Sequence, residues 1–207
     1  MNAGQGDGGR RGYHHGNLRQ ALVDASISLI EERGSTAFTF AEVARKAEVT
    51  PAAPYRHFKD RDALLAEIAR IGFIALAEVL EEAWSSAQPS AIRAFDAVTA
   101  GYLDFACRER AFFAVMFQTD FTNAGDIDLR DANARVFEVL ERSCSGLIRT
   151  RGSDVPVSMV SHHVWALCHG VATLFGRPEP GRPIPMPAGE MLEAATGVYL
   201  RGLGLIE

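Results

Sequence analysis

The stretch TFAEVARKAEVTPAAPYRHF, residues 39–58, decides the fold of this chain. Thr39 is followed three residues later by Glu42, which predicts a capping box in which each residue bonds the other's backbone N–H group at the start of a helix. Apolar residues then recur at helical spacing and give this helix one face to bury: Val43, Ala44 and Ala47. The first half of the stretch therefore predicts a short amphipathic helix.

The second half of the stretch predicts another short helix. Thr50 can cap it, and Pro51 suits its first turn, where a missing N–H group costs nothing. Pro54 removes one further donor, so we expect this helix to be rigid and slightly irregular. It ends in Tyr55-Arg56-His57-Phe58-Lys59, an aromatic and basic segment that we expect to be exposed. Two short helices joined by a tight turn form a helix-turn-helix, a unit that reads DNA.

Helices are predicted on both sides of this unit. Asn17 with Gln20 can cap a long helix that runs to Arg33, and Asp60 can cap another that runs to about Ser85. The segment 55–59 resembles the end of the recognition helix in TetR-type (tetracycline-repressor-like) transcription regulators. The order and spacing of the flanking helices match the N-terminal domain of that family over about residues 13–75. One departure is Glu48 in the turn, where the family often has Gly, because Glu is poor at positive φ.

The resemblance implies a set of DNA-binding residues. Side chains at matching positions commonly touch phosphates in the family: Thr39, Thr50, Tyr55, His57 and Lys59. An exposed face would meet the base edges, and it comprises Pro51, Ala52, Ala53 and Arg56. The alanines offer only methyl contacts, which suit thymine, so Arg56 is the main candidate for reading a guanine if it reaches the bases.

The charge distribution supports this placement of the DNA-binding surface. The formal net charge is −5, but residues 1–62 carry nine Lys or Arg against eight Asp or Glu, with His14, His15 and His57 in reserve. Residues 63–207 carry twelve Lys or Arg against eighteen Asp or Glu. The N-terminal part is therefore the only candidate for a phosphate-binding surface, and its bulk charge predicts modest non-specific affinity.

The whole chain is predicted to be all-α, with about nine helices. We expect a disordered Gly-rich arm at 1–12, a three-helix DNA-binding domain at 13–60, and an antiparallel helical bundle at 61–207 for ligand binding and dimerisation. A loop at 119–127 and a Pro-rich linker at 176–187 interrupt the bundle. The remaining helices are expected at 90–108, 109–118, 128–150, 157–175 and 188–203.

A second resemblance concerns the C-terminal part. Trp165-Ala166-Leu167-Cys168-His169-Gly170 is similar to the Trp…His-Gly signature of one TetR subfamily. His169 is either a core histidine or a ligand-binding residue that lines an effector cavity together with Trp165. Aromatic residues recur at helical intervals, with most in the core and some facing a pocket. The candidate pocket residues for a largely apolar effector are Phe73, Tyr102, Phe105, Met116, Phe137, Trp165 and His169.

The resemblance also implies a homodimer formed through the last two helices as a four-helix bundle. Apolar residues predicted for that interface are Val157, Val160, Val164 and Leu167 on one helix and Met191, Leu192, Ala195, Val198 and Tyr199 on the other.

Other classes of protein fit the sequence poorly. Cys107, Cys144 and Cys168 have no paired spacing, so we expect free thiols in a reducing, cytoplasmic compartment. Arg10-Arg11 is followed by no apolar signal region. Residues 157–175 lack formal charge, but their histidines and hydroxyl groups favour a buried helix over a membrane span. We expect no metal from His162, His163 and His169, because zinc sites use tighter, repeated spacings.

The sequence therefore predicts a ligand-responsive transcription regulator that binds double-stranded operator DNA. We expect a repressor that a small-molecule effector releases from a near-palindromic operator, with an activator of the same fold or a helical enzyme as the alternatives. No cofactor and no catalytic residue is expected, because the chain has neither a Gly-rich phosphate loop nor a nucleophile elbow.

Overall fold

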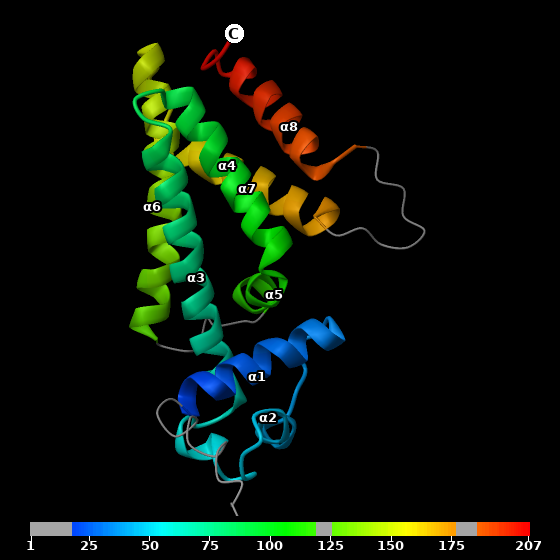
Figure 1. Ribbon diagram of the computed structural model, residues 1–207. Coiled ribbons are helices and arrows are strands. Elements are labelled where there is room, and N and C mark those ends of the chain that lie inside the picture. Colours follow the sequence, from blue (N-terminus) through cyan, green and yellow to red (C-terminus); the bar gives the residue numbers. More distant parts are fainter. Residues whose placement is uncertain (1–17, 119–125, 177–185) are drawn as a thin grey trace, which may run out of the picture. The chain divides into compact units, whose positions relative to one another are not determined.

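The computed structural model describes residues 18–118, 126–176 and 186–207, and these residues form eight α-helices and one short 3₁₀ helix, with no strand among them (Figure 1). The chain divides into two compact units, Met1–Leu65 and Ala66–Glu207. The prediction of an all-α protein is confirmed. The predicted arm at 1–12, the Asn17 cap, the loop at 119–125 and most of the Pro-rich linker lie outside the described residues.

The first unit contains α1 (Leu18–Arg33), α2 (Phe40–Lys46), the 3₁₀ helix η1 (Pro54–Arg56) and the start of α3 (Arg61–Ser86). The predicted capping box is present at α2, since the Glu42 N–H donates to the Thr39 hydroxyl oxygen at 3.3 Å and the Thr39 N–H donates to the Glu42 carboxylate at 2.7 Å. The Asp60 carboxylate caps α3 by accepting from the Ala63 N–H at 2.8 Å. Capping by these polar side chains thus sets where both helices begin.

Apolar side chains from each element fill the core of this unit. The predicted face of α2 is buried at Val43 and Ala44, and α1 contributes Leu22 and Ile30. Phe58 is also buried, with 3% of its surface exposed, so the prediction that the whole segment 55–59 is exposed was wrong at this residue. The ring of Phe58 anchors the segment, because its burial removes a large apolar surface from water.

The second helix of the helix-turn-helix is shorter than predicted. The N–H groups of Ala53, Arg56 and His57 each bond the carbonyl three residues back, and only Phe58 reaches four residues back, to Pro54 at 2.9 Å. Pro54 has no N–H group, so the α-helical bond to Thr50 cannot form. A 3₁₀ turn stands where the sequence predicted an irregular α-helix.

The second unit holds most of α3 together with α4 (Ala91–Arg108), α5 (Arg110–Gln118), α6 (Ile127–Arg151), α7 (Val157–Phe175) and α8 (Ala188–Gly202). These bounds agree with the predicted ranges within about one residue. Ser90 caps α4 and Asp126 caps α6. α4 packs on α6 and α7, and α8 packs on α7 and α4 (Figure 1). None of the helices in the described part of the chain is long and apolar enough to cross a bilayer.

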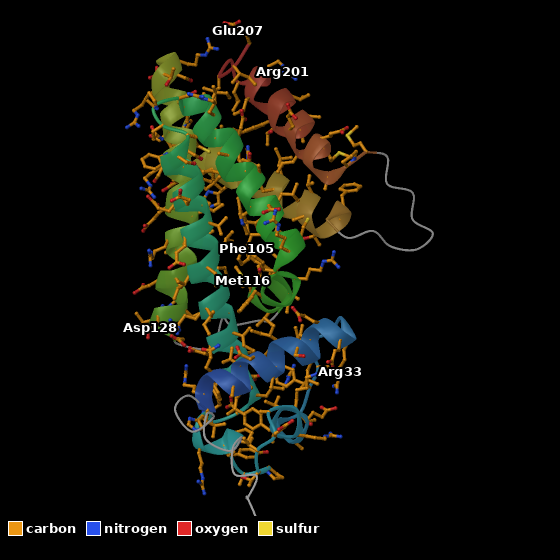
Figure 2. All side chains as sticks on the ribbon, in the orientation of Figure 1. Arg33, Phe105, Met116, Asp128, Arg201 and Glu207 are labelled. Atoms are coloured by element: carbon orange, nitrogen blue, oxygen red, sulfur yellow. The ribbon has the colours of Figure 1, made fainter. Side chains whose placement is uncertain are left out.

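The helices of this unit approach closely where small residues face large ones. A Cβ atom on Gly72 of α3 would lie 2.7 Å from the sulfur of Met116 on α5. Met116 and Phe105 are both buried inside the unit (Figure 2). On the outside, Arg142 of α6 lies over the ring of Trp84, 4.7 Å from its centroid, and pairs with Glu81 of α3. Close packing inside and a cation–π contact outside therefore join α3 to its neighbours.

The turn after α2 has a positive φ at Glu48, the conformation for which Glu is a poor residue. Glu48 has φ of 55°, and the N–H groups of Glu48 and Val49 bond the carbonyls of Arg45 and Ala44 at 3.2 and 2.9 Å. This is a Schellman motif, which normally has Gly at the left-handed position. α6 ends in the same motif with Gly152 at that position, at φ of 60°.

We therefore expect Glu48→Gly to raise the free energy of unfolding by about 1 kcal/mol, because it relieves the left-handed strain at some cost in chain entropy. Urea denaturation of the full chain, followed by circular dichroism, measures the change. Glu48→Ala is the control, since it removes the same carboxylate but keeps the strain. An equal gain in both variants would show that the side chain, not the backbone, is unfavourable.

Candidate functional site

Eight of the nine residues predicted to bind DNA lie on the surface of the first unit. They are Thr39, Thr50, Pro51, Ala52, Tyr55, Arg56, His57 and Lys59. Ala53 is the exception, because only 8% of its surface is exposed. The prediction that Ala53 belongs to an exposed face was wrong, since the 3₁₀ turn directs it inward with Pro54.

The turn presents Tyr55, Arg56 and His57 in succession. The Tyr55 ring packs edge-on against Phe40 of α2, with the ring centroids 4.9 Å apart, while 65% of the residue remains exposed. Arg19 of α1 lies over the buried ring of Phe58, 4.8 Å from its centroid. It is a basic residue of this surface that was not among the predicted DNA-binding residues. Aromatic packing thus fixes the turn and brings a basic side chain from α1 beside it.

Thr39 already has hydrogen-bond partners within the fold. Its hydroxyl group donates to the Glu42 carboxylate at 2.9 Å and accepts from the Glu42 N–H. The Arg33 guanidinium, 2.7 Å from the same carboxylate, and the bonds from Thr39 lower the pKa of Glu42 to about 2. Glu42 therefore stays ionised and holds Thr39 in the orientation of a cap.

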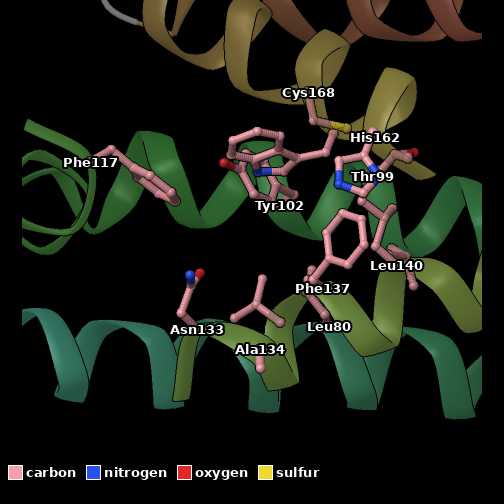
Figure 3. A pocket seen from close by; sticks show the side chains of 13 residues that line it. Leu80, Thr99, Tyr102, Phe117, Asn133, Ala134, Phe137, Leu140, His162 and Cys168 are labelled. Carbon is pink, nitrogen blue, oxygen red and sulfur yellow. The ribbon is translucent and has the colours of Figure 1, made fainter. Parts of the chain in front are cut away.

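The second unit contains a cavity of about 220 Å³ that is open to the surface beside Asn133, Ala134 and His162 (Figure 3). Its walls are mainly aromatic and aliphatic, and no Asp, Glu, Lys or Arg is among the residues that line it. The rings come from Tyr102, Phe117, Phe137, His162 and Trp165; the aliphatic residues are Leu80, Val98, Ala134, Val136 and Leu140; the remaining polar groups are on Thr99, Asn133 and Cys168. Helices α3 to α7 all contribute, so the cavity lies within the bundle.

Three of the seven predicted pocket residues line this cavity: Tyr102, Phe137 and Trp165. Phe73, Phe105 and Met116 are buried but are not in its walls. Phe73 instead packs edge-on against the lining residue Phe117, with ring centroids 5.5 Å apart. Most of the aromatic residues with helical spacing therefore form core, as one of the two readings of the sequence predicted.

His169 lies behind the cavity wall. Its Nδ1 atom is 3.0 Å from the Tyr102 hydroxyl oxygen, and its ring stacks on Phe113, with ring centroids 5.4 Å apart. A neutral imidazole accepts from the Tyr102 hydroxyl group at Nδ1 in one tautomer and donates to its oxygen in the other. Burial lowers the pKa of His169, which keeps the ring neutral for this role.

Four polar lining residues were not predicted for the pocket: Thr99, Asn133, His162 and Cys168. Asn133 on α6 is exposed at the rim, and it lies four residues before Phe137, so a helical repeat could have identified it. His162 on α7 was considered only as a metal ligand, although it lies three residues before Trp165. Within the described residues no three His, Cys, Asp or Glu side chains form a group that could hold a metal ion.

The outer surface of α7 and α8 differs from the predicted interface. Val160, Val164 and Leu192 are buried within the unit, so their assignment to a dimer surface was wrong. The exposed apolar residues are Met159 and Leu174 on α7 and Val198 on α8, the last with 66% of its surface exposed.

Comparison with known proteins agrees with this architecture. The model for bacterial regulatory proteins of the tetR family matches residues 22–68, and the model for the tetracyclin repressor-like C-terminal domain matches residues 95–194. A protein of unknown function from Rhodococcus sp. RHA1 has a structure with a TM-score of 0.78 and 31% identity, covering 94% of this chain and 99% of that one.

Two named regulators are also similar. The TetR family transcriptional regulator PfmR from Thermus thermophilus has a TM-score of 0.68 and 21% identity, over 88% of this chain and 98% of that one. The HTH-type transcriptional regulator BetI from Rhizobium meliloti (strain 1021) is 43% identical over 47 residues, which are 23% of this chain and 23% of that protein. Together, the two family models and the helix-turn-helix show that the chain belongs to the TetR family of DNA-binding transcriptional regulators, whose members are not enzymes.

Proposed function

We propose that the protein is a homodimeric repressor that binds a near-palindromic operator and leaves it when a small, largely apolar effector enters the cavity of the second unit. The observation that carries this proposal is the cavity of about 220 Å³ without a charged lining residue, in a chain whose first unit carries a helix-turn-helix. An apolar cavity is a usual binding site for a small molecule.

The DNA contact is assigned to the exposed part of the turn. Tyr55, His57 and Lys59 supply polar groups for phosphates, with Thr50 before them, and Arg56 is the candidate for a guanine edge. Ala53 is left out because it is buried. Pro51 and Ala52 remain exposed and can make apolar contacts with bases.

Dimerisation is assigned to one exposed stripe on each of the last two helices. Met159, His163, Gly170 and Leu174 recur on α7 at intervals of four or seven residues, and Val198 lies on α8. A Cβ atom added to Gly170 would meet nothing within 4 Å, so the helix is bare there. The His163 Nδ1 atom and the Tyr199 hydroxyl oxygen are 2.9 Å apart and link the two helices. A second copy of the chain can cover this small and apolar surface.

Effector response requires that the ligand bind the DNA-incompetent arrangement better than the competent one. A shift from 1:99 to 99:1 needs about 5.5 kcal/mol of such preference. Phe117 lines the cavity and contacts Phe73 of α3, and the first residues of α3 belong to the first unit. We therefore propose that ligand contacts at Phe117 act on α3.

The central test is selection of bound sequences from random DNA, followed by a screen of small molecules for release of the selected DNA. We expect near-palindromic sites with half-sites about one helical turn, roughly 34–36 Å, apart. Selection of no sequence would contradict the proposed DNA target. Selected DNA that no cavity-binding compound releases would contradict the proposed response to an effector.

Tyr55→Phe and Lys59→Ala are expected to weaken binding to all DNA sequences alike. Phe keeps the packing against Phe40 and removes only the hydroxyl group, and Lys59→Ala should reduce the slope of log affinity against log salt by about one unit per subunit. Arg56→Ala should instead cost about 1–3 kcal/mol at one base position. Gel shifts over a salt series, with operator and mutated operator, measure both effects.

Lys46→Ala is the matched control for Lys59→Ala. Lys46 lies on α2 and pairs with Glu32 of α1, so its loss should leave the salt slope nearly unchanged. Equal slopes for wild type and Lys59→Ala would contradict the phosphate assignment. A uniform loss in Arg56→Ala would make Arg56 a phosphate contact.

Val198→Glu is expected to give monomers that no longer shift operator DNA, because each interface would have to bury two unpaired carboxylates. Ile127→Glu is the control, since Ile127 on α6 is 62% exposed but lies outside the proposed stripe. Sedimentation velocity of both variants measures the assembly state. A dimer of Val198→Glu as stable as the wild type would place the interface elsewhere.

A further inference from the structure

We infer that the cavity is built for an uncharged, planar aromatic compound of about ten to twelve non-hydrogen atoms that carries a hydroxyl group. The inference rests on the proposed function, because it takes the cavity as the effector site and specifies the chemistry of the effector. Three properties of the lining lead to it: the absence of charge, the size and shape of the walls, and the polar groups that are left for a ligand.

The lining cannot balance a charged ligand. No acidic or basic side chain is among the residues around the cavity, which are all within the described part of the chain. The Cys168 thiol stays neutral as well, because burial raises its pKa to about 12. A carboxylate or an ammonium group that entered would lose its hydration without gaining a counter-charge, which is costly. The ligand is therefore uncharged.

The size and walls of the cavity favour a rigid flat molecule. At the packing density of a protein interior, about 0.74, a space of 220 Å³ holds on the order of ten non-hydrogen atoms. Phe117 lies at one side of the cavity and Phe137 at the other, and Tyr102 stands between them (Figure 3). Aromatic rings gain from stacked and edge-on contacts with such walls. A flexible chain of equal size would also lose rotational freedom on binding.

Two of the polar lining groups already have partners. The Thr99 hydroxyl donates to the carbonyl groups of Phe95 and Asp96, both at 3.1 Å, and the Tyr102 hydroxyl is held by His169. Both hydroxyl groups are thus already hydrogen-bonded within the fold.

The polar groups that remain are the Trp165 indole, the Cys168 thiol and the two exposed residues His162 and Asn133. The Nδ1 atom of His162 lies 2.6 Å from the Ser158 carbonyl oxygen, which can only accept, so Nδ1 carries the proton and Nε2 is an acceptor. The Asn133 amide has no hydrogen-bond partner among the residues that the structure describes. The two residues lie at different sides of the cavity in Figure 3. A ligand hydroxyl group donating to Nε2 of His162 would satisfy this acceptor.

The test uses four probes with the full-length protein in isothermal titration calorimetry at neutral pH. 2-Naphthol has the proposed chemistry, naphthalene lacks the hydroxyl group, 2-naphthoate adds a charge, and 1-decanol is neutral but flexible. We expect 2-naphthol to bind about fivefold more tightly than naphthalene and at least about a hundredfold more tightly than 2-naphthoate. 1-Decanol should also bind more weakly than 2-naphthol.

Three variants tie binding to the cavity. Ala134→Phe should abolish binding of 2-naphthol, because Ala134 lies in the wall but is exposed, so a ring there fills the space without disturbing the core. His162→Phe should keep binding but remove the preference for 2-naphthol over naphthalene. Arg135→Ala is the control, since Arg135 is the next residue on α6 and does not line the cavity. Melting curves confirm that each variant is folded.

The inference is overturned if 2-naphthoate or 1-decanol binds as tightly as 2-naphthol, if no probe binds at millimolar concentration, or if Ala134→Phe binds 2-naphthol like the wild type. Release of selected operator DNA by the same probes separates this result from the proposed function. Release by 2-naphthoate but not by 2-naphthol would remove the inferred chemistry and leave the ligand-responsive repressor. Tight binding of 2-naphthol without release of DNA by any probe would support the inferred ligand chemistry and contradict the proposed response to an effector.

Discussion

The hydrogen bond between Tyr102 and His169 joins α4 to α7, and the cavity of the second unit depends on it. Tyr102 is a wall of the cavity, whereas His169 stands behind that wall among Phe113, Phe117 and Trp165. A buried hydroxyl group without a partner is costly, so His169 determines which way the Tyr102 ring points. The histidine of the Trp…His-Gly segment thus shapes the cavity through another residue, which combines the two roles that the sequence left open for it.

Helix ends could be predicted from the sequence because single residues determine them. Thr39 and Glu42 cap α2 through bonds that depend only on local spacing, and Asp60 caps α3 as predicted. The strained turn at Glu48 was foreseen from the family resemblance instead, because the family often has Gly at this position and Glu is poor at positive φ. The α7 helix, Val157–Phe175, was predicted with its full range as an uncharged segment that the Pro-rich linker follows.

The faces of the helices were harder to predict than their ends. Val160 and Val164 could equally have covered a partner subunit or filled the core of their own unit, and apolar spacing alone does not distinguish these two. The same limit explains Phe73, Phe105 and Met116, which are core residues of a bundle that also contains a cavity. In the first unit, the positions of Ala53 and Phe58 depend on the 3₁₀ turn that Pro54 imposes, and one missing donor is enough to change which residue points inward. Tertiary packing decides each of these cases, and it is not encoded in a local pattern.

The neutral ring of His169 makes the stability of the folded protein depend on pH. An exposed imidazole in an unfolded chain has a pKa of about 6.5, whereas burial lowers the pKa of His169 in the folded protein. As the pH falls below about 6.5, the unfolded chain binds a proton before the folded one does, so the folded state loses stability. A protonated ring can only donate at Nδ1, so its hydrogen bond with Tyr102 would run to the hydroxyl oxygen. Mild acid therefore lowers the stability of the folded chain through His169, while the cap of α2 withstands it because the pKa of Glu42 is lowered to about 2.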